Sequence, residues 1–344
     1  MAIFKGTKNE DGTYSMFHFI KRAFYLVSPR LFKEYLNRYY PGISVLNSVI
    51  LLVDFYTCVV VHGAIVTDYF EYAFRDKSFR ARRTFITMRD SRRIQKKYNR
   101  ESAEVFINKE KFNTVFQDYR TIKNYYFNES SKLDDFVSYV ISCNGKVLAK
   151  PLTGHSGFGI HKIDLSSQEN IEKAFKTYSE SREYFCEELF IQTGILGLVN
   201  PNSVNTVRIY TLYDGEQVNI MHALVRFGGG ASCVDNIHGG GMICEVDALN
   251  GTVVGPGYDL MNNRTVYHKM SGKLLLGIQI PQWDRVVTMV KNAALLTPGI
   301  GHVAWDIAVS ETEVCFIEAN EQGNFDAPQC ACQKGSKIIY ANYL

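Results

Sequence analysis

The first hundred residues carry apolar side chains at helical spacing. In residues 18–36 apolar positions recur every three or four residues on both sides of Ser28-Pro29, which predicts two helices separated by a short break. Residues 43–66 are long and apolar enough for a membrane span, but Asp54 lies near their middle, where a carboxylate is costly in lipid. We therefore expect a buried helix or helix pair in a mainly helical N-terminal lobe.

The sequence changes character near residue 147, where glycine becomes frequent and short alternating patterns begin. Residues 206–213 and 217–225 alternate on either side of Asp214-Gly215, a tight-turn sequence, so we expect a β-hairpin. Residues 302–309 and 313–320 predict a second antiparallel pair, and residues 283–294 a helix with one apolar face. Mainly antiparallel sheets combined with helices predict the α+β class.

The composition is that of a folded chain. Of 344 residues, 46% are apolar and 21% charged, which excludes global disorder. The net charge of +3 gives no reason to expect a nucleic-acid partner. Residues 75–100 nevertheless hold eleven Lys or Arg and two Asp. This basic segment is either a solvated face or a surface for an anionic partner, including anionic lipid headgroups or an associated enzyme.

The cysteines indicate a reducing compartment. All eight are scattered, without a CxxC pair or metal-ligand spacing, and the first twenty residues lack the pattern of a secretory signal. We therefore expect a cytoplasmic protein with reduced thiols. The basic segment leaves open a peripheral location at the inner membrane face.

A glycine-rich segment follows a short predicted strand that ends at Lys150-Pro151. Three glycines, at positions 154, 157 and 159, let the backbone turn its N–H groups toward an anion, and a lysine adds a point charge. The segment matches neither the Walker A pattern nor the dinucleotide fingerprint. It is either a phosphate cradle or a glycine-rich hairpin without a ligand.

Three oxygen-bearing side chains converge on the last predicted strand pair. Asp306 lies on one strand, and Glu318 and Asn320 lie two residues apart on its partner, so the latter two share one face. Carboxylates combined with phosphate oxygens and water are the ligands that Mg²⁺ prefers, although a structural hydrogen-bond network is the alternative. Arg208 and Arg226, on the strands of the first hairpin, would supply positive charge for an anionic substrate.

The order of these motifs resembles the ATP-grasp superfamily, which includes carboxylate–amine ligases such as glutathione synthetase. Three phrases are similar to the sugar-transfer-associated ATP-grasp family: Asn200-Pro-Asn-Ser-Val-Asn-Thr-Val-Arg208, Val234-Asp-Asn236-Ile-His238-Gly-Gly, and Trp305-Asp306 followed by Ile317-Glu318-Ala-Asn320. The resemblance implies an ATP-grasp fold with two α+β subdomains behind the helical lobe. The implied domains are residues 1–105 for the lobe, 106–192 for the subdomain with the glycine-rich phosphate loop, and 193–344 for the subdomain with the metal and substrate site.

The resemblance also implies how ATP is held. Lys111 and Lys150 would contact its phosphates, under a loop that contains Gly154, His155, Ser156, Gly157 and Gly159. The adenine would meet a hinge made of Glu187, Glu188, Leu189 and Phe190, with one of the two glutamates near the adenine amino group or the ribose. Asp306, Glu318 and Asn320 would hold two Mg²⁺ ions, for which Mn²⁺ can substitute.

The remaining motif residues would act on the substrates. Arg226 would stabilise the transferred phosphoryl group, with Arg208 and Asn236 supporting it. Either His155 or His238, in the two glycine loops, would contact a substrate or shuttle a proton, unless they are simply loop histidines. The implied reaction is ADP-forming and joins a carboxylate to an amine through an acyl phosphate. The family points to an amino acid and a sugar or sugar acid, as small molecules or lipid-linked, in surface-polysaccharide biosynthesis. A kinase on the same fold and a nucleotide-binding scaffold at the inner membrane face are the alternatives.

Overall fold

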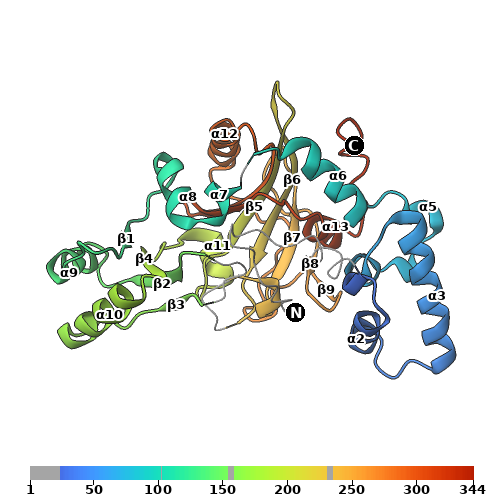
Figure 1. Ribbon diagram of the computed structural model, residues 1–344, viewed down its shortest axis with the longest axis horizontal. Helices are drawn as coiled ribbons and strands as arrows, with labels where there is room; N and C mark the ends of the chain where they lie inside the picture. The colour runs from blue at the N-terminus through green and yellow to red at the C-terminus, as the bar shows by residue number, and fades with distance from the viewer. Residues whose placement is uncertain (1–23, 102, 154–158, 231–234) are drawn as a thin grey trace. The chain divides into compact units, whose positions relative to one another are not determined.

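The structure is a computed structural model that describes residues 24–101, 103–153, 159–230 and 235–344 (Figure 1). The chain divides into two compact units. The first comprises Met1–Arg93 together with Phe325–Leu344, and the second comprises Ile94–Asn324. The boundary at residue 93 falls before the predicted boundary at residue 105. The C-terminal segment, Phe325–Leu344, belongs to the first unit. The three predicted domains themselves remain a prediction.

The first unit is helical in its described part, as its sequence predicts. Its elements are α2 (Pro29–Tyr39), α3 (Val45–His62), α4 (Val66–Glu71), η1 (Phe74–Asp76), α5 (Phe79–Arg82), the first half of α6 (Met88–Tyr98) and α13 (Asp326–Cys332). Ser28 caps α2 by accepting from the N–H of Leu31, with Pro29 in the first turn. Gln329 in α13 bonds both backbone groups of Ile86, at 2.8 and 2.9 Å, which ties the C-terminal segment to this unit.

The expectation of a buried helix or helix pair at residues 43–66 is wrong. The segment forms one helix, α3, which begins after the Ser44 cap and ends at Gly63 in the left-handed conformation. Only one side of α3 is buried, where Phe55 packs on Phe32 and Tyr69. Of the 18 residues of α3, 22% are buried. By length and composition alone, the helix is long and apolar enough to cross a membrane.

The second unit contains two sheets. The smaller has strand order β1-β4-β2-β3, with all neighbours antiparallel: β1 (Asn124–Tyr126), β4 (Tyr184–Glu188), β2 (Val147–Pro151) and β3 (His161–Lys162). The helices α9 (Leu133–Ser142) and α10 (Gln168–Ser181) cover one face, where Ala149 and Cys186 are buried with Phe136 (Figure 1). Because side chains alternate along a strand, Lys150 and Glu187 lie on the opposite face.

The larger sheet has seven strands in the order β11-β10-β5-β6-β7-β8-β9. They are β5 (Thr206–Tyr213), β6 (Val218–Phe227), β7 (Met242–Val246), β8 (Gly257–Tyr258), β9 (Arg264–Thr265), β10 (His302–Val309) and β11 (Val314–Asn320). The predicted hairpin and the predicted second pair are confirmed, because β5 pairs with β6 and β10 pairs with β11, both antiparallel.

Helices and a large apolar core cover one face of this sheet. The core joins Trp305 and Phe316 of the sheet to Phe112 and Phe116, and to Val286 of the predicted helix α12 (Trp283–Ala294). The other elements of this unit are α7 (Glu104–Ile107), α8 (Lys109–Val115), η2 (Gln117–Tyr119), α11 (Gly194–Val199) and η3 (Ile237–Gly239). The opposite face carries the polar side chains that the sequence singled out.

Candidate active site

The predicted metal carboxylate lies at the centre of the polar face of the larger sheet. Asp306 in β10 is directly opposite Arg208 in β5 on one side and Glu318 in β11 on the other. Residues paired across antiparallel strands point to the same face, so the three side chains meet. Arg208 donates to both oxygens of the fully buried Asp306, with Nε 2.6 Å and Nη2 2.5 Å away. Arg226 Nη2 lies 3.1 Å from Asp306 Oδ2.

The two carboxylates differ in their affinity for a proton. Burial raises the pKa of Asp306, but the charges of Arg208 and Arg226 outweigh it and hold that pKa below its usual value. Burial and the neighbouring Asp306 charge raise the pKa of Glu318. A cation between the two carboxylates would offset their mutual repulsion and favour the ionised form of Glu318. Asn320 shares the face of Glu318, so the residues present fit a hard cation such as Mg²⁺.

Arg226 is held in place from behind. Its Nε and Nη2 donate to Thr206 Oγ1 at 2.9 and 2.6 Å. The backbone N–H and hydroxyl of Thr206 in turn donate to Asp235 Oδ2 at 2.8 and 2.6 Å, and Arg226 Nη2 lies 3.4 Å from Asp235 Oδ1. A rigid guanidinium beside Asp306 is suited to neutralising charge on a transferred phosphoryl group, because no reorganisation is needed when the charge moves.

The first family phrase builds the frame around the two arginines. Asn205 is fully buried and accepts from the N–H of Gly228 at 3.1 Å, while Asn200 donates to the Gly228 carbonyl at 2.9 Å. A Cβ atom at Gly228 would lie 2.3 Å from Ser203 Oγ, so only glycine permits this approach. Asn200, Ser203 and Asn205 therefore fix the start of β5 against the end of β6, where the arginines stand.

On the polar face of the smaller sheet, one carboxylate pairs with two cationic side chains. Lys150 Nζ and Arg120 Nη2 both pair with Glu187, the latter at 2.7 Å, and all three side chains are at most 7% exposed. Burial raises the pKa of Glu187, but the charges of Lys150 and Arg120 bring it below its usual value. Arg120 also donates to the carbonyl of Phe316 in β11 at 2.6 Å. The excess positive charge favours an anion in front of Lys150.

The structure distinguishes the two glutamates of the predicted hinge. Glu187 is tied to the cations, whereas the Glu188 carboxylate accepts from the backbone N–H of Lys123 at 3.1 Å. The N–H of Leu189 donates to the carbonyl of Lys146 at 2.8 Å. Phe190 is buried in a small apolar cluster with Ile122, Ala308 and Cys315.

The lysine that approaches the site from α8 is Lys109. The cap residue Asn108 accepts from the N–H groups of Glu110 and Lys111, so the helix starts at Lys109. Residues two apart on a helix point about 200° apart, so Lys109 and Lys111 lie on different sides. Lys111 pairs with Glu104 and its side chain is 49% exposed. The structure therefore does not bring Lys111 to the other site residues.

Lys109 stands among the charged groups of both sheets. Burial lowers its pKa, and the charges that act on it are those of Glu318, Lys150 and Glu187. Its backbone N–H donates to the carbonyl of Leu152 at 3.2 Å, directly before the glycine loop. Lys109, rather than Lys111, therefore lies among the charged groups of the site.

The glycine-rich loops are described in part. Gly154, His155, Ser156 and Gly157 lie outside the described residues, as does the side chain of His238. Gly159 has a φ of 79°, and a Cβ atom there would lie 2.9 Å from Pro151, so glycine is required. The backbone carbonyl of the half-buried Asn236 accepts from the N–H groups of Gly239 and Gly241, which closes the turn that contains η3.

Sequence reasoning assigned no role to Lys109, Arg120, Thr206 or Asp235. Arg120 follows η2 and faces Glu187, which is 67 residues away in the chain, so no local pattern reveals it. Asp235 and Thr206 do stand in the family phrases, beside Asn236 and before Arg208. Their position in those phrases was the signal that could have found them.

The chain thus has two antiparallel sheets with helices on one face of each. Cations gather on the polar face of the smaller sheet and a carboxylate pair on that of the larger, an arrangement typical of the ATP-grasp fold. The sequence model of the sugar-transfer associated ATP-grasp family matches residues 88–339. The chain belongs to that family, and both the predicted fold and the predicted family are confirmed. Comparison with the curated proteins gives no sequence match.

Solved ATP-grasp enzymes are among the structures similar to this chain. N5-carboxyaminoimidazole synthase from Aspergillus clavatus, in complex with ADP and 5-aminoimidazole ribonucleotide, is 10% identical, with a TM-score of 0.39, over 67% of this chain and 52% of that one. D-alanine-D-alanine ligase from Coxiella burnetii is 9% identical, with a TM-score of 0.40, over 70% and 58%. The chain thus spans a little more than half of their length.

Proposed function

We propose that this protein is an ATP-dependent, ADP-forming carboxylate–amine ligase. The observation that carries the proposal is the group of Asp306, Glu318, Arg208 and Arg226 on one sheet face, with the fully buried Asp306 at its centre. Together with the cations around Glu187 it supplies what phosphoryl transfer needs, namely fixed positive charge and a cation-binding carboxylate pair. The family supports the use of ATP.

Each group has a role in holding the nucleotide. Lys150 and Lys109 would contact the phosphates, and Arg120 would position Lys150 through their shared Glu187. Asp306, Glu318 and Asn320 would hold Mg²⁺, which when bound neutralises charge on the β- and γ-phosphates. Asp306 is already paired with Arg208, so it would offer the remaining lone pairs of its carboxylate.

The reaction would proceed in two displacements. A carboxylate oxygen of the first substrate attacks the γ-phosphorus, the bond from that phosphorus to the bridging oxygen breaks, and ADP leaves. The amine of the second substrate then attacks the carbonyl carbon of the acyl phosphate; inorganic phosphate leaves and the amine loses a proton to solvent. Arg226, held by Thr206 and Asp235, would neutralise the phosphoryl oxygens in both steps.

The substrate class rests on the family alone. We infer an amino acid as one substrate and a sugar or sugar acid, free or lipid-linked, as the other. With these substrates the enzyme would act in surface-polysaccharide biosynthesis, in the cytoplasm beside glycosyltransferases.

Phosphorus NMR tests the proposal. The protein is incubated with Mg·ATP, a pool of uronic acids and amino sugars, and a pool of amino acids, with hydroxylamine in a parallel tube. ADP, free phosphate and a trapped hydroxamate support a ligase, whereas a new phosphomonoester would establish the kinase alternative. Glu318→Gln should abolish ADP formation, whereas Glu313→Gln, at an exposed glutamate directly before β11, should not.

A further inference from the structure

The helix α3 presents an apolar face that no described part of its unit covers. Nine of its ten exposed positions share one side of the helix and follow it from end to end: Val45, Leu46, Val49, Ile50, Val53, Tyr56, Thr57, Val60 and Val61. The tenth is Asn47, which is uncharged and lies in the first turn. Val53 is 63% exposed and Val60 78%. At 1.5 Å per residue this face is about 25 Å long. Monomeric soluble proteins rarely leave so long an apolar surface in water.

The single acidic residue of α3 lies at the edge of this face, where an ion pair holds its partly exposed side chain. Asp54 accepts two hydrogen bonds from Arg82, at 2.7 and 2.9 Å, and a third from the hydroxyl of Tyr69 at 2.8 Å. Within α3, all of whose residues the structure describes, the exposed positions therefore carry no charge. An uncharged outer face beside a fully paired acid fits a helix that meets an apolar medium on one side.

A transmembrane orientation does not fit the same contacts. The inner side of α3 packs through Phe55, which is fully buried against Phe32 and Tyr69, and through Leu51 and Cys58. Insertion across a bilayer would strip these contacts and break the Arg82–Asp54 pair in lipid, where an isolated charge is costly. The helix can instead lie in the plane of a membrane surface with its unit attached.

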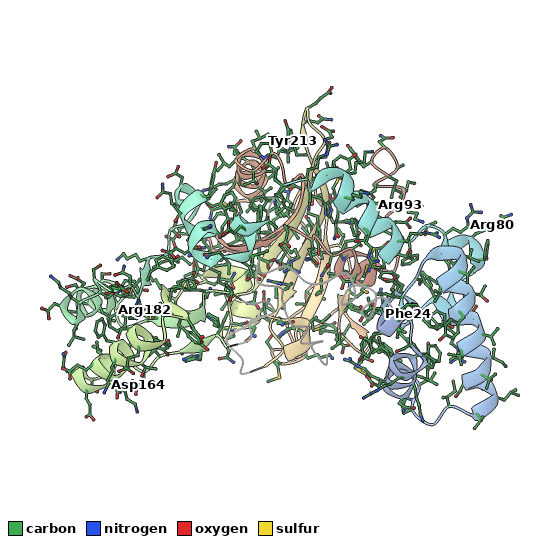
Figure 2. The ribbon with its side chains drawn as sticks, in the orientation of Figure 1. Phe24, Arg80, Arg93, Asp164, Arg182 and Tyr213 are labelled. Carbon is green, nitrogen blue, oxygen red and sulfur yellow. The ribbon has the colours of Figure 1, made fainter. Side chains whose placement is uncertain are left out.

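Positive charge gathers beside one end of the apolar face. His62 at the end of α3 contacts the ring of Phe79 at 5.3 Å, and Phe79 opens α5 with 54% of its side chain exposed. Arg80 projects outward there, as its label in Figure 2 shows, and Arg83 is also exposed. Arg89 donates to the carbonyl of Val61 at 3.0 Å, which fixes a third exposed arginine at this end.

We propose that the outer face of α3 and the adjoining arginines form a docking surface for an anionic lipid bilayer. The aliphatic side chains enter the headgroup and acyl boundary, and Arg80, Arg83 and Arg89 meet anionic headgroups. The proposal goes beyond the ligase activity and does not depend on it. It also replaces the basic segment, as the principal membrane contact, by the apolar helix beside it.

Vesicle flotation with the full-length protein tests this surface. We expect binding to vesicles of phosphatidylcholine with phosphatidylglycerol, and little to phosphatidylcholine alone. Val53→Glu with Val60→Glu should weaken binding about tenfold or more, because two aliphatic groups that would enter the bilayer are lost. Arg80→Glu with Arg83→Glu should weaken it about tenfold and reduce its salt dependence. Leu249→Glu, at a 91% exposed leucine of the other unit, is the matched control and should bind like the parent.

Two further measurements separate other occupants of the face. The Val53→Glu, Val60→Glu variant should melt at the parent temperature without vesicles, and sedimentation velocity should show the same species for both proteins. A lowered melting temperature would mean that other residues of the chain cover the face. A parent dimer that the substitutions dissociate would mean that a second copy covers it. Either result, or vesicle binding that the substitutions leave unchanged, overturns the proposal.

Discussion

The two lysines of α8 allow the site to be tested with a matched pair of variants. Lys109 is half-buried among the charges of Glu318, Lys150 and Glu187, whereas Lys111 pairs with Glu104 at the surface. Lys109→Met removes a cation that would make a charge-assisted hydrogen bond to a phosphate, a loss of about 1.5–3 kcal/mol. At about 1.4 kcal/mol for each factor of ten, nucleotide affinity should fall about ten- to a hundredfold.

Lys111→Met is the control. The exposed ion pair between Lys111 and Glu104 contributes about 0–1 kcal/mol to stability, and we expect it to contribute nothing to nucleotide binding. Titration calorimetry with Mg·ADP and Mg·ATP, together with initial rates of ADP formation, measures both variants against the parent. Thermal melting shows that each is folded. A loss confined to Lys111→Met, or an equal loss in both, would refute the placement of Lys109.

Three further predictions follow from single contacts. Arg120→Met leaves Glu187 with one cation and removes the bond to β11, so we expect a lower melting temperature and weaker binding of ATP by calorimetry; unchanged values for both would contradict the shared role. Gly228→Ala places a methyl group on Ser203 Oγ and should lower the free energy of unfolding in urea by about 1–3 kcal/mol, whereas alanine at the open Gly230 should cost less than Gly228→Ala. Because the pKa of Glu318 is raised in the fold, the folded state binds more protons, so stability without Mg²⁺ should fall as the pH rises above the ordinary Glu value of 4.5. Saturating Mg²⁺ should remove that fall. If Mg²⁺ changes the melting temperature at no pH, the cation site is excluded.

Local patterns were sufficient for β5, β6, β10 and β11, the four strands that carry the arginines and the carboxylates. The alternation on either side of Asp214-Gly215 predicts β5 and β6, and the spacing of Glu318 and Asn320 places both on one face of β11. These are properties of neighbouring residues. They do not depend on how distant segments pack.

Long-range packing decided what the sequence left open. Lys109 and Lys111 have the same chemistry, and only the start of α8 at the Asn108 cap determines which of them faces the site. Arg120 gains its role from Glu187 across the sheet. The outer side of α3 is apolar like its inner side, so its composition indicated a core helix, and only the tertiary contacts show that one side is uncovered.

The most direct test of the ligase assignment follows one oxygen atom. A donor carboxylate labelled with ¹⁸O, supplied with Mg·ATP and an amine, should release inorganic phosphate that carries one ¹⁸O, because the attacking oxygen stays on phosphorus when the amine displaces it. Phosphate that takes its new oxygen from labelled water instead, with an unlabelled donor, would show hydrolysis of ATP without an acyl phosphate and would contradict the account.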